Sequence, residues 1–440
     1  MENLNAFLER AGAFVWGPPL IILLFGTHLF LTFRLGFIQR HILKGIKLSF
    51  SRKSEGEGEI SHFGALTTAL AATIGTGNIV GVATAVAAGG PGAVLWMWLT
   101  GVFGIATKYA EALLSVKYRV IAPDGQVSGG PMYVLERGLN ARWLGLIFAF
   151  FTAVAAFGIG NMVQANSISQ MLHNSFGLPT WGTGAVMTAL TAFVILGGIK
   201  SIAKFCERLV PLMAVCYVLG CAVILLLNFD KLPGTIALIL SSAFSGQAAV
   251  GGFLGAGAKE AMRYGIARGL FSNESGLGSA PIVAAAAQTS NPVRQALVSS
   301  TGTFWDTVVV CLLTGLVIVS AGDWQSGLKG AALTKSAFSH IPYIGPTVLS
   351  LGLLTFVFST IIGWEYYGEK AAEYLLGARA VKPYRWLWIA AVMVGSVAAL
   401  PAVWNFADIF NGLMAVPNLI SLLLLAPVIA AETKKYIKEI

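Results

Sequence analysis

A stretch without charged side chains, from His62 to Gly92, carries two glycines and an asparagine in the middle of an apolar run. The run is long enough to cross a lipid bilayer as a helix, and its centre is Ile74-Gly75-Thr76-Gly77-Asn78. Glycines and polar side chains at this depth allow the backbone to leave the helix. The peptide groups released there need partners, which an ion or a small substrate can supply. We therefore predict a broken membrane helix, with close helix packing as the alternative role of the glycines.

The composition of the whole chain supports a membrane protein. Of its 440 residues, 56% are hydrophobic and only 11% are charged, whereas soluble proteins have about a quarter charged residues. We expect an all-α polytopic membrane protein in contact with the lipid bilayer. The net charge of +9 then reports topology and anionic lipid rather than nucleic acid. The sequence also lacks a phosphate-binding loop motif, so nothing indicates that ATP drives the protein.

Hydropathy predicts eleven crossings, at residues 14–33, 63–88, 93–117, 143–172, 181–199, 209–228, 261–288, 296–320, 346–375, 386–403 and 406–431. The basic segment 34–59 is predicted to form an amphipathic interfacial helix and a polar loop. The uncharged stretch 235–258 is long enough to cross, but crossing would place the later Lys and Arg residues outside, against the positive-inside rule. We therefore assign it to the interface. The N-terminus is then outside and the C-terminus is in the cytoplasm.

The sequence contains a weak internal repeat. A shift of 201 residues places Ile74-Gly75-Thr76-Gly77-Asn78 on Ser275-Gly276-Leu277-Gly278-Ser279, and it places Gln164 on Glu365. Five predicted crossings separate the copies, so they have opposite orientations, as in the inverted repeats of secondary transporters. The predicted division is an extra N-terminal helix and interfacial segment (1–60), a first repeat (61–230), an interfacial segment (231–260), a second repeat (261–431) and a cytoplasmic tail (432–440).

Six motifs resemble those of the alanine or glycine:cation symporter family: TIGTGNI (73–79), GGPGA (89–93), KYAEA (108–112), GGPMY (129–133), FSNESGLGSAP (271–281) and WNFAD (404–408). The resemblance covers nearly the whole chain. It implies sodium-coupled uptake of alanine or glycine by alternating access, on a LeuT-type 5+5 inverted repeat with one extra N-terminal helix. It also implies a plasma-membrane protein with Na⁺ as coupling ion, no cofactor and no enzymatic activity, and we expect it to be a monomer.

An amino acid is a zwitterion, and its carboxylate needs N–H donors. The start of the second half of a broken helix offers such donors together with a favourable dipole. We expect Gly75, Thr76 and Gly77 to supply backbone groups and Asn78 to add its side-chain amide. In the family, Gln164 is expected to assist from the opposite wall. Its alternative role is a packing hydrogen bond between helices.

The ammonium group needs acceptors, and the size of the substrate needs a wall. Carbonyl groups at the second break, around Phe271, Ser272 and Gly276, are the candidate acceptors. Trp364 follows Thr360 by one helical turn and is expected to face the same way. Trp364 and Phe271 then enclose the substrate and favour glycine and alanine.

Sodium needs oxygen ligands, and the resemblance places them between spans 1 and 8. The expected ligands are the carbonyl groups of Ala71 and Ile74 with the hydroxyl groups of Ser359 and Thr360. Serine and threonine in membrane helices usually bond back to their own carbonyl groups, which is the alternative role of these two hydroxyls.

The charged residues within the spans leave two rival functions open. Lys108 and Glu111 stand at i,i+3 and are expected to pair. Glu274 has three possible roles, which are to orient a backbone group, bind a proton or help hold a cation. A proton-coupled transporter of another small substrate would use Glu274 or Glu365 as carrier. A membrane-embedded enzyme would need a convergent His/Asp, Cys/His or metal cluster, and the sequence offers none.

Overall fold

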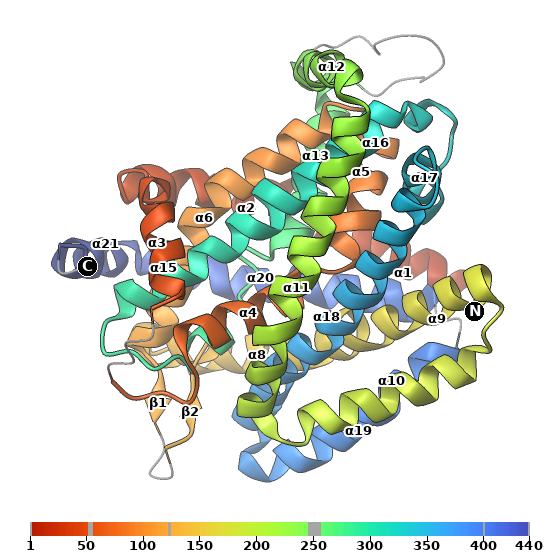
Figure 1. The fold of residues 1–440 in the computed structure, drawn as a ribbon. Coiled ribbons are helices and arrows are strands. Elements are labelled where there is room, and N and C mark those ends of the chain that lie inside the picture. The colour runs from red at the N-terminus through yellow and green to blue at the C-terminus, as the bar shows by residue number, and fades with distance from the viewer. Residues whose placement is uncertain (1, 52–55, 122–124, 245–256, 399–400, 439–440) are drawn as a thin grey trace.

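The computed structural model describes residues 2–51, 56–121, 125–244, 257–398 and 401–438. Helices make up almost all of the described chain (Figure 1). Within these residues the only strands are β1 (Val120–Ile121) and β2 (Val127–Ser128), which pair antiparallel. The prediction of an all-α protein is confirmed.

The N-terminal part contains two consecutive helices and a short basic one. They are α1 (Glu2–Val15), α2 (Pro18–Arg34), η1 (Ile38–His41) and α3 (Ile42–Ser49). The first predicted crossing therefore begins earlier than residue 14, and its helix is interrupted at Gly17, ahead of two prolines. The predicted interfacial helix corresponds to α3.

The first repeat contains the first helix break. Its elements are α4 (His62–Thr73), η2 (Gly77–Gly81), α5 (Val82–Gly89), α6 (Ala93–Lys117), α7 (Pro131–Leu139), α8 (Arg142–Ala155), η3 (Ala156–Met162), α9 (Val163–Phe176), α10 (Thr180–Ile195) and α11 (Gly198–Leu227). The connection to the second repeat begins with η4 (Phe229–Lys231) and α12 (Leu232–Phe244). Figure 1 shows α12 end-on, across the end of α11. Residues 245–256 of the predicted interfacial stretch lie outside the described residues.

The second repeat contains the second break. Its elements are α13 (Ala258–Asn273), α14 (Pro281–Ala284), α15 (Pro292–Thr303), η5 (Phe304–Cys311), α16 (Leu312–Ala321), η6 (Asp323–Gln325), α17 (Gly330–Ser339), α18 (Ile344–Leu376), η7 (Ala378–Ala380), α19 (Val381–Val397) and α20 (Pro401–Leu424). The last helix is α21 (Ala426–Tyr436).

The two broken helices cross in opposite directions. α13 packs along α5 and η2, and α14 contacts α4, so each half-helix lies beside the opposite half of the other. Outside this pair, α10 packs against α19, and α18 packs against α4 and α8. This is the arrangement that an inverted repeat predicts.

Length and composition identify six continuous helical stretches in the described residues that can cross a membrane, and a seventh if the bent pair α4 and η2–α5 counts as one. The other predicted crossings fall on α6, α10, α19 and the interrupted pair α13 and α14. The count of eleven crossings therefore stays a prediction.

Three predicted segment ends were wrong. Residues 200–208, predicted to connect two spans, belong to α11, because the chain turns at Gly198 (φ +66°) and the basic residues continue the helix. Residues 285–288, predicted as helix, instead pair with the chain before α4 through an Ile60–Ala287 bridge. The last span ends at Leu424 rather than at residue 431, because α21 begins at Ala426 with a proline at its second position.

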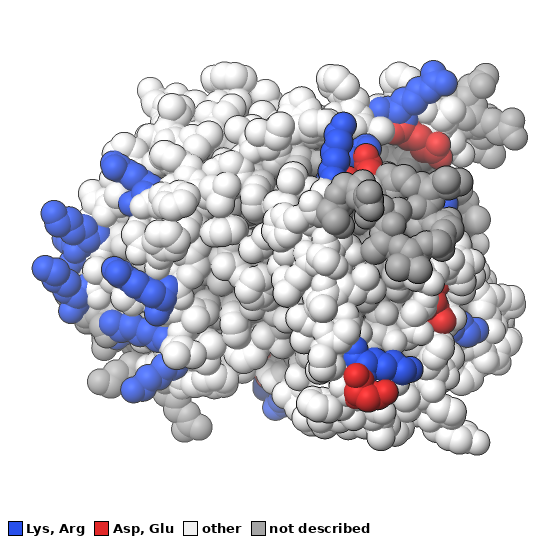
Figure 2. All heavy atoms as spheres, turned by 90° about the horizontal axis from the view of Figure 1, so that it is seen from above, with Lys and Arg blue, Asp and Glu red and all other residues white. Residues whose placement is uncertain are grey.

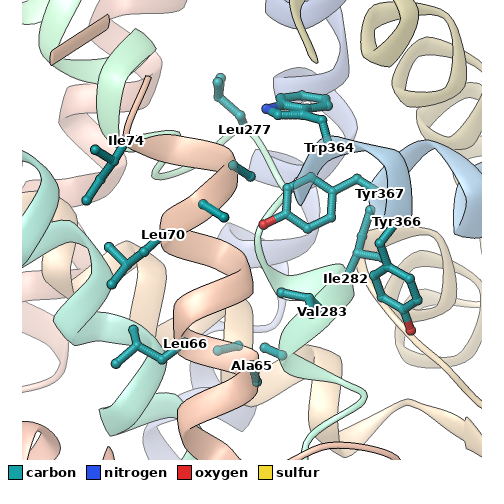
Figure 3. Packing of buried hydrophobic residues seen from close by; sticks show 14 of the residues in the cluster. Ala65, Leu66, Leu70, Ile74, Leu277, Ile282, Val283, Trp364, Tyr366 and Tyr367 are labelled. Carbon is teal, nitrogen blue, oxygen red and sulfur yellow. The ribbon is translucent and has the colours of Figure 1, made fainter. Parts of the chain in front are cut away.

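The core lies between α4 and α18. Figure 3 shows Ile74 and Leu70 on one side and Trp364 and Tyr367 on the other, with the Tyr367 ring directed towards α4. A Cβ on Gly363 would lie 2.7 Å from the backbone nitrogen of Ala72, so this glycine lets the two helix backbones approach closely. The first break is therefore held directly against α18.

Basic side chains gather at one end of the molecule. Figure 2 shows Lys and Arg along the left edge with no Asp or Glu visible beside them, whereas the two signs are mixed on the right. The left edge is the end where Figure 1 shows α3 and α21. This asymmetry is typical of a membrane protein with one basic face.

Candidate functional site

The first helix break is braced by a side chain of its own segment. The axis bends by 53° between α4 and η2–α5. The backbone N–H of Gly75 donates to Asn78 Oδ1 over 2.8 Å, which satisfies one donor that the break releases. A Cβ on Gly75 would lie 2.6 Å from Thr360 Oγ1. Glycine therefore allows the break to lie directly against α18.

The second break contains three residues with positive φ. Glu274 has φ 55°, and Gly276 and Gly278 both have φ 90°. Glu111 Oε1, on α6, accepts the N–H groups of Gly276 at 3.0 Å and Gly278 at 3.1 Å. Asn418, on α20, donates to Glu111 Oε1 over 2.7 Å and to the Gly276 carbonyl over 2.9 Å. Two side chains from neighbouring helices thus satisfy the peptide groups that this break releases.

A narrow cavity lies where the two breaks, η3, α18 and α20 meet. Its volume is about 20 Å³, which is space for one or two water molecules. Its lining residues are Ala72, Thr73, Gly75, Thr76, Gly77, Ile159, Gln164, Phe271, Glu274, Thr360, Trp364 and Asn411. Glycine and alanine have more atoms than this space holds, so the cavity must widen before either can enter.

The Trp364 indole forms a fixed wall of the cavity. Its Nε1 donates to Glu274 Oε1 over 3.0 Å, and Glu274 Oε2 accepts from the Ser279 hydroxyl over 2.5 Å. On the other side of the indole, a Cβ on Gly160 of η3 would overlap Trp364. Trp364 is 2% exposed, so the ring is held by contacts on both sides.

Two amide side chains bring acceptor atoms to the cavity. Gln164 donates through Nε2 to the Ile159 carbonyl over 2.8 Å. Among the described residues, its Oε1 and the Oδ1 of Asn411 are buried without a hydrogen-bond partner. A buried acceptor without a donor is costly. Both atoms therefore favour a ligand that carries N–H groups.

Four oxygen atoms from α4 and α18 lie together beside the first break. Ser359 Oγ is 3.2 Å from the Ala71 carbonyl oxygen, and Thr360 Oγ1 is 3.4 Å from the Ile74 carbonyl oxygen. Both hydroxyls also donate to the Phe356 carbonyl, at 2.8 and 2.9 Å. All four atoms are hydroxyl or carbonyl oxygens, and hard cations prefer such oxygen ligands.

The structure brings most of the predicted substrate residues to the cavity but not all. Those that line it are Gly75, Thr76, Gly77, Gln164, Phe271, Thr360 and Trp364. The lining does not include Asn78, Ser272 or Gly276. The Gly276 carbonyl, predicted to accept the ammonium group, already accepts from Asn418.

Asn78 and Ser272 are turned towards Asp306 of η5. Asn78 Nδ2 donates to Asp306 Oδ1 over 2.7 Å, and the hydroxyls of Ser272 and Thr307 donate to Asp306 Oδ2 over 3.0 and 2.6 Å. One buried carboxylate thus connects the first break to the helix that leads into the second. Sequence reasoning missed this role, although a carboxylate within a span is itself a signal of function.

The expected pair of Lys108 and Glu111 does not form. Among the described residues, Lys108 Nζ has no hydrogen-bond partner, and Glu111 Oε1 is taken by the second break and Asn418. The i,i+3 spacing places both residues on one helix face, but the released N–H groups compete for the carboxylate. Asn411 and Asn418 were also missed, because neither lies in a recognisable motif.

The fold and the cavity define a class of protein, a secondary transporter of the LeuT fold. The chain matches a solved structure described as MhsT in complex with L-phenylalanine, with a TM-score of 0.53 and 16% identity, over 85% of this chain and 98% of that one. At this identity the likeness concerns the fold alone.

The family follows from the sequence comparison. The model of the sodium:alanine symporter family matches residues 1–440. A sodium/alanine symporter, AgcS, of Methanococcus maripaludis is 51% identical over 98% of this chain and 97% of its own length. An uncharacterized transporter of Haemophilus influenzae is 52% identical over 100% of this chain and 97% of its own length. This chain belongs to the sodium:alanine symporter family, and its function is cation-coupled symport of amino acids.

Proposed function

We propose that this chain imports alanine or glycine with sodium ions by alternating access, as a monomer in the plasma membrane. The observation that carries the proposal is the small cavity between the two breaks, with a cluster of four oxygens beside it. The name of the Methanococcus relative, a sodium/alanine symporter, supports the same substrate and ion.

The substrate carboxylate binds at the first break. Thr76 and Gly77 lie at the beginning of the resumed helix, where N–H groups have no acceptor within the helix and the dipole favours an anion. The Gly75 N–H is used by Asn78, so Asn78 acts by shaping the break rather than by direct contact. The substrate ammonium group binds at the opposite wall, where the free acceptor atoms of Gln164 and Asn411 lie.

Selectivity for small side chains comes from Trp364 and Phe271. Trp364 is fixed between Glu274 and Gly160, so it moves little to admit a larger substrate. One methylene group changes binding by about 1–3 kcal/mol. Selectivity is therefore graded between glycine and alanine and steep where a side chain overlaps the indole.

Sodium binds to the carbonyl oxygens of Ala71 and Ile74 and the hydroxyl oxygens of Ser359 and Thr360. The ion joins α4, just before its break, to α18 and thereby favours the geometry of the substrate cavity. Inward movement of one net charge across about 100 mV contributes about 2.3 kcal/mol. The basic end seen in Figure 2 supports a cytoplasmic location for that end, and we propose that the N-terminus is outside and the C-terminus inside.

Uptake of labelled alanine into proteoliposomes tests the proposal. We expect accumulation with an inward sodium gradient and none with an equal potassium gradient. A proton-coupled transporter is the rival, because the Glu274 carboxylate lines the cavity. Equal accumulation with an inward proton gradient in the absence of sodium would establish the rival and exclude sodium as the required ion.

A further inference from the structure

Another and much larger cavity is lined mainly by charged and polar residues. Its volume is about 720 Å³, and it lies between the α10–α11 turn and the α18–α19 turn. Five basic and three acidic residues line it, namely Lys200, Lys370, Arg379, Lys382, Arg385, Glu59, Glu369 and Glu373. It shares no lining residue with the cavity between the helix breaks.

The acidic residues of this cavity already have partners. Arg385 pairs with Glu369, and Lys370 Nζ lies 2.8 Å from Glu373 Oε2. Glu59 Oε1 accepts the backbone N–H of Val127 over 2.8 Å. The backbone contact does not neutralise Glu59, so the five basic and three acidic residues give the cavity a net charge of +2.

Three basic residues of the cavity take part in no ion pair within the part of the chain that the structure describes. They are Lys200 at the beginning of α11, Arg379 in η7 and Lys382 at the beginning of α19. All three are exposed. They come from two separate turns, so a single anion between the turns can contact residues from both.

Exposed apolar side chains surround the opening of the cavity, and we call them its apolar frame. Leu196 at its edge is 44% exposed, and Leu376 and Trp386, in the helices that flank it, are 76% and 61% exposed. Such side chains on a membrane protein contact lipid, and tryptophan is typical of the headgroup level. The free cations therefore lie at the depth of lipid phosphates, next to a surface that acyl chains can cover.

We propose that this cavity binds the phosphate of an anionic phospholipid headgroup. Arg379 offers a planar fork of donors that matches phosphate oxygens, and Lys200 and Lys382 add point charges. Basic pockets between membrane helices on the cytoplasmic side bind anionic headgroups in this way. Inorganic phosphate has the same oxygen chemistry but lacks acyl chains, so it contacts the cations without the apolar frame.

The test measures the thermal unfolding midpoint of the full chain in an uncharged detergent. The probes are dioctanoylphosphatidylglycerol, dioctanoylphosphatidylcholine and potassium phosphate, each over a concentration series. We expect phosphatidylglycerol to raise the midpoint at much lower concentration than phosphatidylcholine. The double variant Arg379→Gln/Lys382→Gln is expected to need about thirtyfold more phosphatidylglycerol, because each Lys or Arg near an anionic surface contributes about fivefold.

The matched control removes the same charge from α3, which contributes no residue to the cavity. Lys44→Gln/Lys47→Gln on α3 is expected to keep the wild-type half-saturating concentration. The single variant Lys200→Gln tests the site separately, with an expected change of about fivefold. A phosphate effect as strong as that of the lipid, and lost in the double variant, would support the site with a soluble anion as its ligand. Equal responses of the double variant, the control and the wild type would overturn the proposal.

Discussion

Trp364 on α18 and Glu274 in the second break are joined by a 3.0 Å hydrogen bond from the indole Nε1 to the carboxylate Oε1. Both residues line the cavity between the breaks. The wall that limits the size of the substrate is therefore attached to the backbone segment that has left the helix. A ligand that displaces the indole also displaces Glu274, so an oversized ligand disturbs the break as well as the wall.

Trp364→Phe removes this hydrogen bond and enlarges the cavity. This bond holds the indole in the wall of the cavity, and a hydrogen bond contributes about 0.5–1.5 kcal/mol, so we expect alanine to bind up to about tenfold more weakly. We also expect the preference for alanine over valine to fall, because the wall is smaller. Competition binding with both amino acids measures the two effects. Trp388→Phe is the control, since Trp388 is buried in α19 away from the cavity; equal losses in both variants would indicate a general packing defect.

Gly75→Ala places a methyl group against the proposed cation site. The new Cβ would lie 2.6 Å from Thr360 Oγ1, so the hydroxyl must move away from the Ile74 carbonyl. We expect the sodium concentration for half-maximal uptake to rise at least tenfold. Gly81→Ala in the same segment is the matched control, because its nearest atom would be 3.9 Å away. An unchanged sodium dependence in Gly75→Ala would show that the Thr360 hydroxyl does not bind the ion.

Glu111→Gln weakens the contacts that hold the second break. The carboxylate accepts from the N–H groups of Gly276 and Gly278, and loss of its charge is expected to cost about 2 kcal/mol of stability. A fall in the unfolding midpoint together with slower uptake is the expected result. Glu432→Gln provides the comparison, because its pair with Lys117 is partly exposed and contributes about 0–1 kcal/mol. Similar midpoints for the two variants would show that Glu111 does not support the break.

Arg119→Gln releases the chain that follows α14. The guanidinium donates to the carbonyl groups of Ala285 and Ala287 at 2.8 and 2.7 Å, and to those of Glu57 and Thr289 at 2.6 and 2.8 Å. We expect faster hydrogen exchange in segments 57–60 and 285–289 of the variant, because these contacts join the two segments. Arg142→Gln, whose nearest carboxylate is 3.9 Å away, should exchange like the wild type. Unaltered exchange in Arg119→Gln would show that the Ile60–Ala287 bridge holds the two segments together without the arginine.

Hydropathy predicted the helices well and their ends poorly. Apolar runs identify a span because the bilayer interior excludes unpaired peptide groups. A helix that continues into the headgroup region, such as the beginning of α11 at Gly198, becomes polar and escapes this signal. The end of the short α14 was missed for the opposite reason, because the alanines at 285–287 read as a continued apolar helix, yet this segment pairs with the chain before α4.

The position of the two breaks could be predicted, but the direction of their side chains could not. Gly75 and Gly276 mark places where the backbone can leave the helix. Asn78 is next to the first break in sequence, yet its amide points to Asp306, 228 residues further along the chain. Asn411 reaches the cavity from α20. Such contacts depend on how distant helices pack, which one sequence does not reveal.

Alanine binding to the purified protein in sodium chloride and in choline chloride of equal ionic strength tests the central claim most directly. The account predicts at least tenfold tighter binding in sodium chloride, and, by linkage, an equal factor by which alanine tightens sodium binding. Ser359→Ala, which removes one hydroxyl of the proposed cation site, is predicted to reduce this difference strongly. Equal alanine affinity in the two salts would contradict the account.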